Sequence, residues 1–255
     1  MDILVIGAGA SSAAAVSNLS SLGVNILCLE QGDWMNTNEY PSNFKNWQTI
    51  RDQQFNQSPN IRKRETDYPI NEEDSEIEVA NFNGVGGGTI LYSGHFPRMK
   101  PSDFSVKSLD GVADDWPLTY QDLDPYFAQN DKNMGVSGLS GDPMIPYHDM
   151  PLHHIPIGKM GDAMGRGFNK LGWHWWPSDS TVATKQYDGR DQCINLGACV
   201  AGCAQGAKAS TDITYWPHAI RAGVELRTRC RVREIIVRTD GMAGGAVYFL
   251  SLIHI

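Results

Sequence analysis

The stretch Ile3-Leu4-Val5-Ile6-Gly7-Ala8-Gly9-Ala10-Ser11-Ser12 decides the fold of this chain. Its first four residues form a short apolar run rich in β-branched side chains, which is typical of a buried strand. The small residues from Ala13 to Leu22 suit a helix, which Gly23 would end. A second apolar run, from Asn25 to Glu30, predicts another buried strand. The order strand, glycine turn, helix, strand predicts a βαβ unit and hence an α/β fold.

The glycine turn has the spacing of a dinucleotide-binding motif. Gly7 would permit the tight turn out of the strand, and Gly9 would let a pyrophosphate approach the backbone at the positive end of the helix. Ser12 takes the place of the third glycine or alanine of that motif. Glu30 ends the second strand, where its carboxylate can accept hydrogen bonds from both ribose hydroxyls. Together these features predict a bound dinucleotide, either NAD or FAD, and the alternative is a glycine-rich structural turn.

Composition excludes several functions. The 255 residues carry 21 Lys and Arg against 29 Asp and Glu, a net charge of -8. Binding to nucleic acid needs clustered Lys and Arg, and the richest basic run is only Arg62-Lys63-Arg64. No stretch approaches the roughly 20 apolar residues that cross a bilayer. The sequence does not separate a cytoplasmic from a periplasmic or membrane-associated location, although the absence of a signal peptide favours the cytoplasm.

A second glycine run, Gly84-Val85-Gly86-Gly87-Gly88-Thr89, is the densest in the chain. The residues from Ile77 to Phe82 are compatible with a strand that leads into it. Three consecutive glycines suit a loop that lies against a flat ligand or a pyrophosphate, with its amides free to donate. A merely flexible loop is the alternative.

Further along the chain the sequence predicts two longer helices and three strands. Asp124 before Pro125 resembles an N-cap, and Gly135 would end the helix that follows. Apolar residues at helical spacing from Ile157 to Leu171 predict another helix, which Gly172 would end. The strand-like runs are Val224 to Thr228, Arg231 to Arg238 and Gly245 to Leu250.

Residues 84–98, GVGGGTILYSGHFPR, resemble the second flavin-contacting segment of the glucose-methanol-choline (GMC) oxidoreductases. Three further blocks also look like this family, namely 101–104, 114–127 and 189–210. The resemblance runs from Asp2 to about Tyr248 in consistent order. The closest branch comprises the bacterial gluconate and sugar dehydrogenase flavoproteins.

This resemblance implies an FAD-dependent oxidoreductase that acts on CH-OH groups of alcohols, polyols or sugars by transferring hydride to flavin N5. It also implies a discontinuous architecture. A Rossmann-like FAD-binding domain would occupy residues 1–100, with a surface excursion at 31–77, and would resume at 215–248. An interleaved α+β substrate domain would occupy residues 101–214. The family places its catalytic His and a His or Asn partner later in a longer chain, so we expect the catalytic residues in an absent C-terminal part and a fragment inactive alone. The run from Phe249 to Ile255 stays apolar where a polar turn is expected, which predicts a foreign tail at 249–255. The alternative is a terminal strand paired in the sheet.

Carried over by position, the family's cofactor contacts fall on both glycine runs and on the residues that follow them. The pyrophosphate would lie at Gly7, Gly9, Ala10, Ser11 and Ser12, and the adenosine ribose at Glu30 and Gln31. The phosphates and flavin would lie along Gly86, Gly87, Gly88 and Thr89, the isoalloxazine ring near Ser93 and Gly94, and the adenine at the backbone of Val232.

Three cysteines, Cys193, Cys199 and Cys203, lie close together in a loop rich in Gly and Ala. Thiolates on a tight loop are soft ligands suited to an iron-sulfur cluster, and some sugar dehydrogenases of this family hold a three-iron cluster on a similar spacing. Such a cluster would pass electrons singly to a cytochrome or another acceptor subunit. The alternatives are ordinary thiols, or a structural zinc with His218 as a fourth ligand.

Two alternative functions stay open at this point. The chain would then be a flavin-binding or NAD-binding protein of another family that shares only the βαβ fold, or a non-catalytic electron-transfer or binding module.

Overall fold

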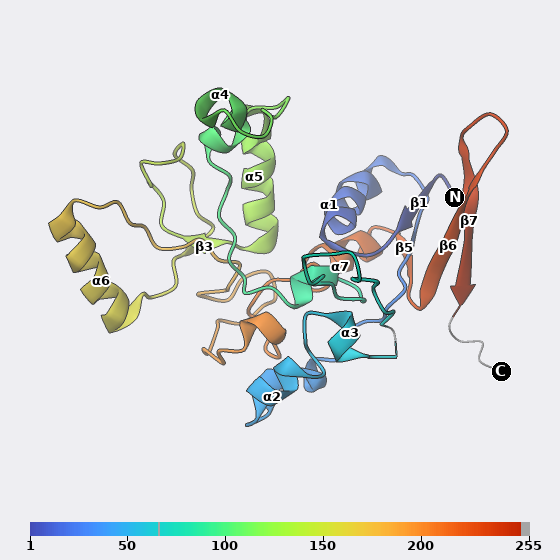
Figure 1. The fold of residues 1–255 in the computed structure, drawn as a ribbon, viewed down its shortest axis with the longest axis horizontal. Coiled ribbons are helices and arrows are strands. Elements are labelled where there is room, and N and C mark those ends of the chain that lie inside the picture. Colours follow the sequence, from blue (N-terminus) through green and yellow to red (C-terminus); the bar gives the residue numbers. More distant parts are fainter. Residues whose placement is uncertain (66, 251–255) are drawn as a thin grey trace. The chain divides into compact units, whose positions relative to one another are not determined.

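The computed structural model describes residues 1–65 and 67–250, which form two compact units (Figure 1). The first unit combines residues 1–93 with the chain from Asn195 onward, and the second comprises Gly94–Ile194. The domain boundaries predicted from the sequence lie at 100/101 and 214/215, and the units of the structure change at 93/94 and 194/195. Residues 195–214 join the first unit because they bond to its second glycine run: Thr211 N donates to Thr89 Oγ1 over 3.1 Å. Tyr92 Oη likewise donates to the carbonyl of Ala209 over 2.7 Å.

A three-stranded parallel sheet forms the base of the first unit. It contains β1 (Ile3–Ile6), β2 (Ile26–Leu29) and β5 (Glu225–Arg227), with β2 in the middle. Helix α1 (Ala10–Leu19) connects β1 to β2, and α7 (Tyr215–Arg221) packs against it. The predicted βαβ unit is therefore confirmed. Gly23 follows the last turn of this helical segment with φ 71°, a left-handed conformation that favours glycine.

An antiparallel hairpin follows the sheet. Its strands are β6 (Cys230–Val237) and β7 (Ala243–Leu250), so all three C-terminal strands predicted from the sequence are confirmed within two residues. Phe249 and Leu250 pair with Arg231 and Cys230 and complete the hairpin. The rest of the expected foreign tail, 251–255, lies outside the described residues.

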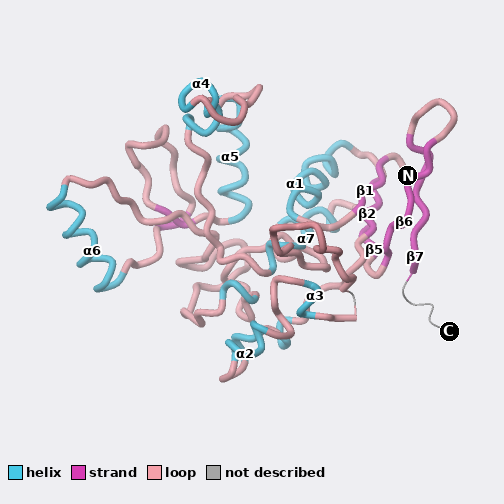
Figure 2. Tube along the Cα trace, in the orientation of Figure 1, coloured by secondary structure: helices cyan, strands magenta, loops and turns pink. Residues whose placement is uncertain are grey.

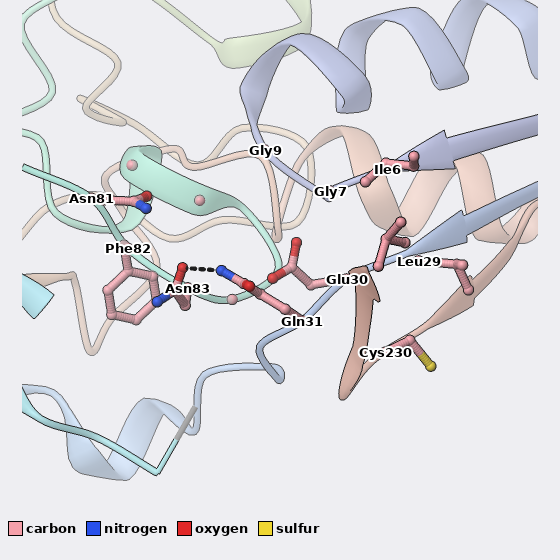
Figure 3. Close-up of a pocket in the computed structure, with 14 residues that line it drawn as sticks. Ile6, Gly7, Gly9, Leu29, Glu30, Gln31, Asn81, Phe82, Asn83 and Cys230 are labelled. Carbon is pink, nitrogen blue, oxygen red and sulfur yellow. Dashed lines mark hydrogen bonds between the residues drawn. The ribbon is translucent and has the colours of Figure 1, made fainter. Parts of the chain in front are cut away.

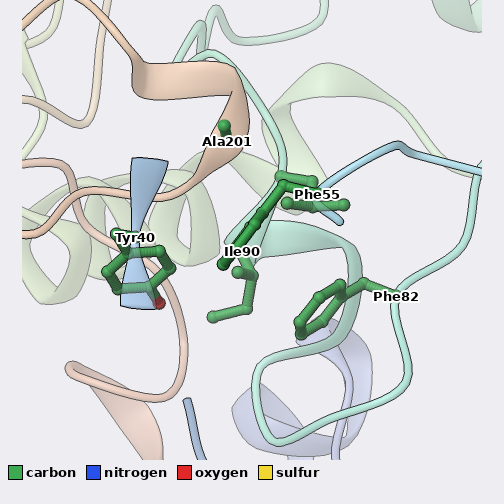
Figure 4. Close-up of a cluster of buried hydrophobic side chains, with 6 residues drawn as sticks. Tyr40, Phe55, Phe82, Ile90 and Ala201 are labelled. Carbon is green, nitrogen blue, oxygen red and sulfur yellow. The ribbon is translucent and has the colours of Figure 1, made fainter. Parts of the chain in front are cut away.

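The predicted surface excursion contributes to the core of the first unit. It contains two short helices, α2 (Trp47–Asp52) and α3 (Pro59–Arg62). Six side chains gather in one buried cluster, shown in Figure 4: Tyr40, Phe55, Phe82, Ile90, Leu91 and Ala201. Two of these, Tyr40 and Phe55, come from the excursion.

The strand expected from Ile77 to Phe82 is wrong. No neighbouring strand pairs with these residues in the described structure. Asn81 N instead donates to the carbonyl of Gln57 over 3.0 Å, so this segment belongs to a loop.

The second unit consists of short elements joined by long loops, as Figure 2 shows. Its helices are α4 (Val106–Asp110), α5 (Tyr120–Met134) and α6 (Gly158–Leu171), and β3 (Ser137–Gly138) pairs in parallel with β4 (Leu152–His153). None of the described helices has the length and apolar character needed to cross a membrane.

Three helix boundaries were predicted from the sequence for α5 and α6, namely one start and two glycine stops. Gly135 and Gly172 follow the helices in the left-handed conformation, as predicted. The start predicted at Asp124 is wrong, because Thr119 and Asp122 form a capping box that begins α5 earlier.

Candidate functional site

A cavity of about 380 Å³ opens in the first unit at the C-terminal ends of β1 and β2 (Figure 3). Ligands of doubly wound α/β proteins bind at this edge of the sheet. Seven of the residues predicted to bind a cofactor line the cavity: Gly7, Gly9, Glu30, Gln31, Gly87, Gly88 and Val232. The other lining residues are Ile6, Leu29, Asn81, Phe82, Asn83, Gly84 and Cys230.

The first glycine run forms the turn between β1 and α1. Gly7 has φ 87°, and its amide donates to the carbonyl of Leu29 over 2.8 Å. Gly9 is the N-cap of α1 and provides no side-chain acceptor for the first amides of the helix. A helix start of this kind, open to a cavity, is suited to an anionic group. Three further predicted contacts, Ala10, Ser11 and Ser12, form the first turn of α1 and are not among the residues that line the cavity.

The second glycine run lies directly against the first. Gly86 has φ 98°, and its amide donates to the carbonyl of Ala8 over 2.9 Å. Gly87 begins a short 3-10 turn that extends to Ile90, with φ 52° at Gly87 itself. Gly86 and Thr89 do not line the cavity, but they hold this loop in its conformation, because Thr89 Oγ1 donates to the carbonyl of Gly86 over 2.6 Å. The second run is therefore a fixed turn, which disfavours the alternative of a merely flexible loop.

Glu30 provides buried acceptors at the end of β2. Its Oε2 accepts a hydrogen bond of 2.7 Å from the amide of Ala8, and its Oε1 accepts one of 2.8 Å from the amide of Gly32. The residue is only 5% exposed. Each carboxylate oxygen can accept a further hydrogen bond, so the group can hold hydroxyls while it braces the turn.

Long-range contacts of two side chains, which the sequence did not reveal, support the glycine runs. The indole Nε1 of Trp216, on α7, donates to the carbonyl of Ala8 over 2.9 Å. The Nζ of Lys208 donates to three carbonyls, those of Ile90 (2.9 Å), Tyr92 (2.7 Å) and Cys199 (2.8 Å). Burial lowers the pKa of Lys208 to about 8. A single tryptophan and a single lysine carry no spacing signal, so only the structure identifies these contacts.

The wall opposite Glu30 was also missed. It consists of Asn81, Phe82, Asn83 and Gly84, which come immediately before the second glycine run. Gly84 forms a parallel bridge with Asp33, and Val85 N donates to the carbonyl of Asp33 over 3.2 Å. The available sequence signal was a phenylalanine flanked by two asparagines, Asn81 and Asn83, directly before the second glycine run.

Ser93 and Gly94 do not line the cavity. Ser93 is the last residue of this part of the first unit, and Gly94 begins the second. In the second unit the carbonyl of Gly94 accepts the amide of Thr181 over 2.8 Å. Their predicted place near a flavin ring stays a prediction.

The three cysteines are divided between the units. Cys199 and Cys203 belong to the first unit and Cys193 to the second, and each is partly buried. Across residues 1–65 and 67–250, no three His, Cys, Asp or Glu side chains are grouped so that they could hold a metal ion. The structure thus gives no support to the predicted iron-sulfur site.

Comparison with known proteins gives relatives over nearly the whole chain. The chain is 37% identical over 252 residues to 2-methyl-1,2-propanediol dehydrogenase of Mycolicibacterium austroafricanum, covering 97% of this chain and 45% of that protein. It is 26% identical to the fructose dehydrogenase large subunit of Gluconobacter japonicus, covering 81% of this chain and 41% of the relative.

A solved structure has the same fold. Pyridoxine 4-oxidase from Mesorbium loti superposes with a TM-score of 0.57 at 14% identity, covering 98% of this chain and 47% of that one. The chain therefore spans less than half the length of each of these three proteins. The model of the GMC oxidoreductase family matches residues 1–250. The match includes both glycine runs that meet at the cavity, and the chain is a member of the GMC oxidoreductase family.

Proposed function

We propose that this chain forms the FAD-binding half of an oxidoreductase that removes hydride from the CH-OH group of an alcohol, polyol or sugar. The observation that carries the proposal is the meeting of both glycine runs with the buried Glu30 around one cavity. Membership of the GMC family removes the alternative of an unrelated protein that shares only the βαβ unit.

The residues present fit the adenosine diphosphate half of FAD. The open start of α1 and the backbone of Gly9 and Gly88 can supply amides for a pyrophosphate. Gly7 and Gly87, whose amides donate to the carbonyls of Leu29 and Gly84, allow its close approach. Glu30 supplies acceptors for ribose hydroxyls, and Val232 borders the cavity on the side proposed for adenine. Bound FAD would supply the acceptor for the hydride, and this chain would bind and orient the FAD.

The names of the relatives support a hydroxyl-bearing substrate. One relative is a dehydrogenase of a diol and another is the large subunit of a fructose dehydrogenase. We extend this chemistry to the present protein, together with an electron-accepting subunit as partner.

The experiment uses the complete protein that contains this chain. Purified protein should show a flavin absorbance spectrum, release FAD on denaturation, and bleach under anaerobic conditions when polyols or sugars are added. An enzyme that has no visible spectrum and requires NAD would contradict the proposal. Iron and sulfide assays on the same sample decide the three-cysteine prediction, because a cluster requires both in proportion to flavin.

A further inference from the structure

We propose that Asp67, which does not line the cavity, determines the hydrogen-bonding character of the cavity residue Gln31, and that it acts through Asn83. Gln31 would thereby accept a hydrogen bond from the ribose of an adenine nucleotide. This inference rests on the proposed function, because it concerns the ligand of the same cavity.

The network starts at a buried ion pair in the excursion. Arg62 and Asp67 are 0% and 3% exposed in their side chains. Arg62 contacts both carboxylate oxygens, with Nη2 2.5 Å from Oδ1 and Nε 2.8 Å from Oδ2. Such a two-pronged contact fixes the position of the carboxylate as well as its charge.

Arg62 also anchors the cavity wall. Its Nη1 donates to the carbonyl of Asn81 over 3.0 Å and to that of Asn56 over 2.8 Å. Its guanidinium carbon lies 4.9 Å from the ring centre of Phe82. The ion pair is thus attached to the segment that carries Asn83.

The chemistry of the carboxylate fixes the orientation of the next group. Asp67 can only accept, so Asn83 must turn its amide nitrogen toward it, and Nδ2 donates to Oδ1 of Asp67 over 3.1 Å. The amide oxygen of Asn83 then faces the opposite way. There it accepts a hydrogen bond from Nε2 of Gln31, drawn as the dashed line in Figure 3.

The same logic applies to Gln31. Because its amide nitrogen is turned to Asn83, its Oε1 is the acceptor that remains on this cavity-lining residue. Glu30, the preceding residue, also offers only acceptors. The end of β2 is therefore matched to hydroxyl donors, and a 2′-phosphate, itself an acceptor, would be repelled.

The test measures ADP and 2′-deoxy-ADP binding by calorimetry to the complete apoprotein. ADP should bind at least 10-fold more tightly, given the usual strength of hydrogen bonds to charged and neutral acceptors. Gln31→Met, Asn83→Leu and Asp67→Asn should each reduce this preference about threefold or more. The double variant Gln31→Met/Asn83→Leu should show no further reduction beyond Gln31→Met alone, because Asn83 acts through Gln31.

Controls separate this role from a merely structural one. Gln54→Met, at an exposed glutamine of the same unit, should keep the wild-type preference. Gln31→Met leaves the Arg62–Asp67 pair intact, so it remains informative if the buried variants fail to fold. Equal weakening of both nucleotides, or an unchanged preference in Gln31→Met, overturns the inference. If the wild type binds neither ADP nor FAD, the proposed function fails instead.

Discussion

A Cβ atom on Gly87 would lie 3.0 Å from the Cα of Gly9. The two glycine runs therefore touch backbone to backbone, and no room remains for a side chain between them. This contact gives the second run a requirement for glycine that comes from the protein itself as well as from its ligand, whereas a Cβ atom on Gly9 would meet nothing within 4 Å. It also allows the two requirements to be separated by mutation.

Gly87→Ala should destabilise the protein by about 1–3 kcal/mol, because the methyl group meets the Gly9 backbone and φ 52° disfavours a side chain. Urea unfolding measures this change. Gly88→Ala is the matched control, since its Cβ meets nothing within 4 Å. Its free energy of unfolding should change by less than about 0.5 kcal/mol. Its affinity for FAD should nevertheless fall, because Gly88 lines the cavity. Equal stability of the two variants would contradict the packing argument.

Trp216→Phe should cost about 1–3 kcal/mol of unfolding free energy. The variant removes the donor to the carbonyl of Ala8 and leaves a small void at a site that is 0% exposed. Because Ala8 lies inside the first glycine run, FAD affinity should fall as well. Trp34→Phe, at a residue 41% exposed, should change neither quantity measurably. Loss of stability with unchanged FAD affinity would show that Trp216 does not position the turn.

Local signals account for what could be predicted from the sequence. The β1–α1–β2 unit and the glycine stops at Gly135 and Gly172 depend on neighbours a few residues apart, and they were predicted correctly. The start of α5 was not, because two capping signals compete and Thr119 with Asp122 forms the stronger one. The contacts that brace the cavity join residues far apart in the chain. The bond from Trp216 to Ala8 and the chain from Asp67 to Gln31 have no periodicity or spacing that a single sequence reveals.

Lys208→Met should destabilise the protein by about 2–4 kcal/mol. Methionine has a similar volume but donates no hydrogen bond, so three buried carbonyls each lose a donor. Relief of the cost of burying the ammonium group offsets part of this loss. Lys45→Met, at an exposed lysine of the same unit, should stay within about 0.5 kcal/mol of the wild type. A stabilised Lys208→Met protein would mean that the desolvation cost exceeds the three hydrogen bonds.

Asp179→Asn should flatten the pH dependence of stability between about pH 4 and pH 6. Burial raises the pKa of Asp179 to about 6 in the folded state, while His148 opposes this shift. Between the unfolded and folded pKa values the folded state binds more protons, so its stability falls as pH rises through this window. The loss is complete above the folded pKa and amounts to roughly 2–3 kcal/mol. Asp179→Asn should therefore unfold at a higher temperature than the wild type at pH 7, and similarly at pH 4. Asp162→Asn, at an exposed residue of α6, should keep the wild-type curve. A wild-type curve that rises from pH 4 to pH 6, with no change in Asp179→Asn, would show that this carboxyl is ionised at no cost.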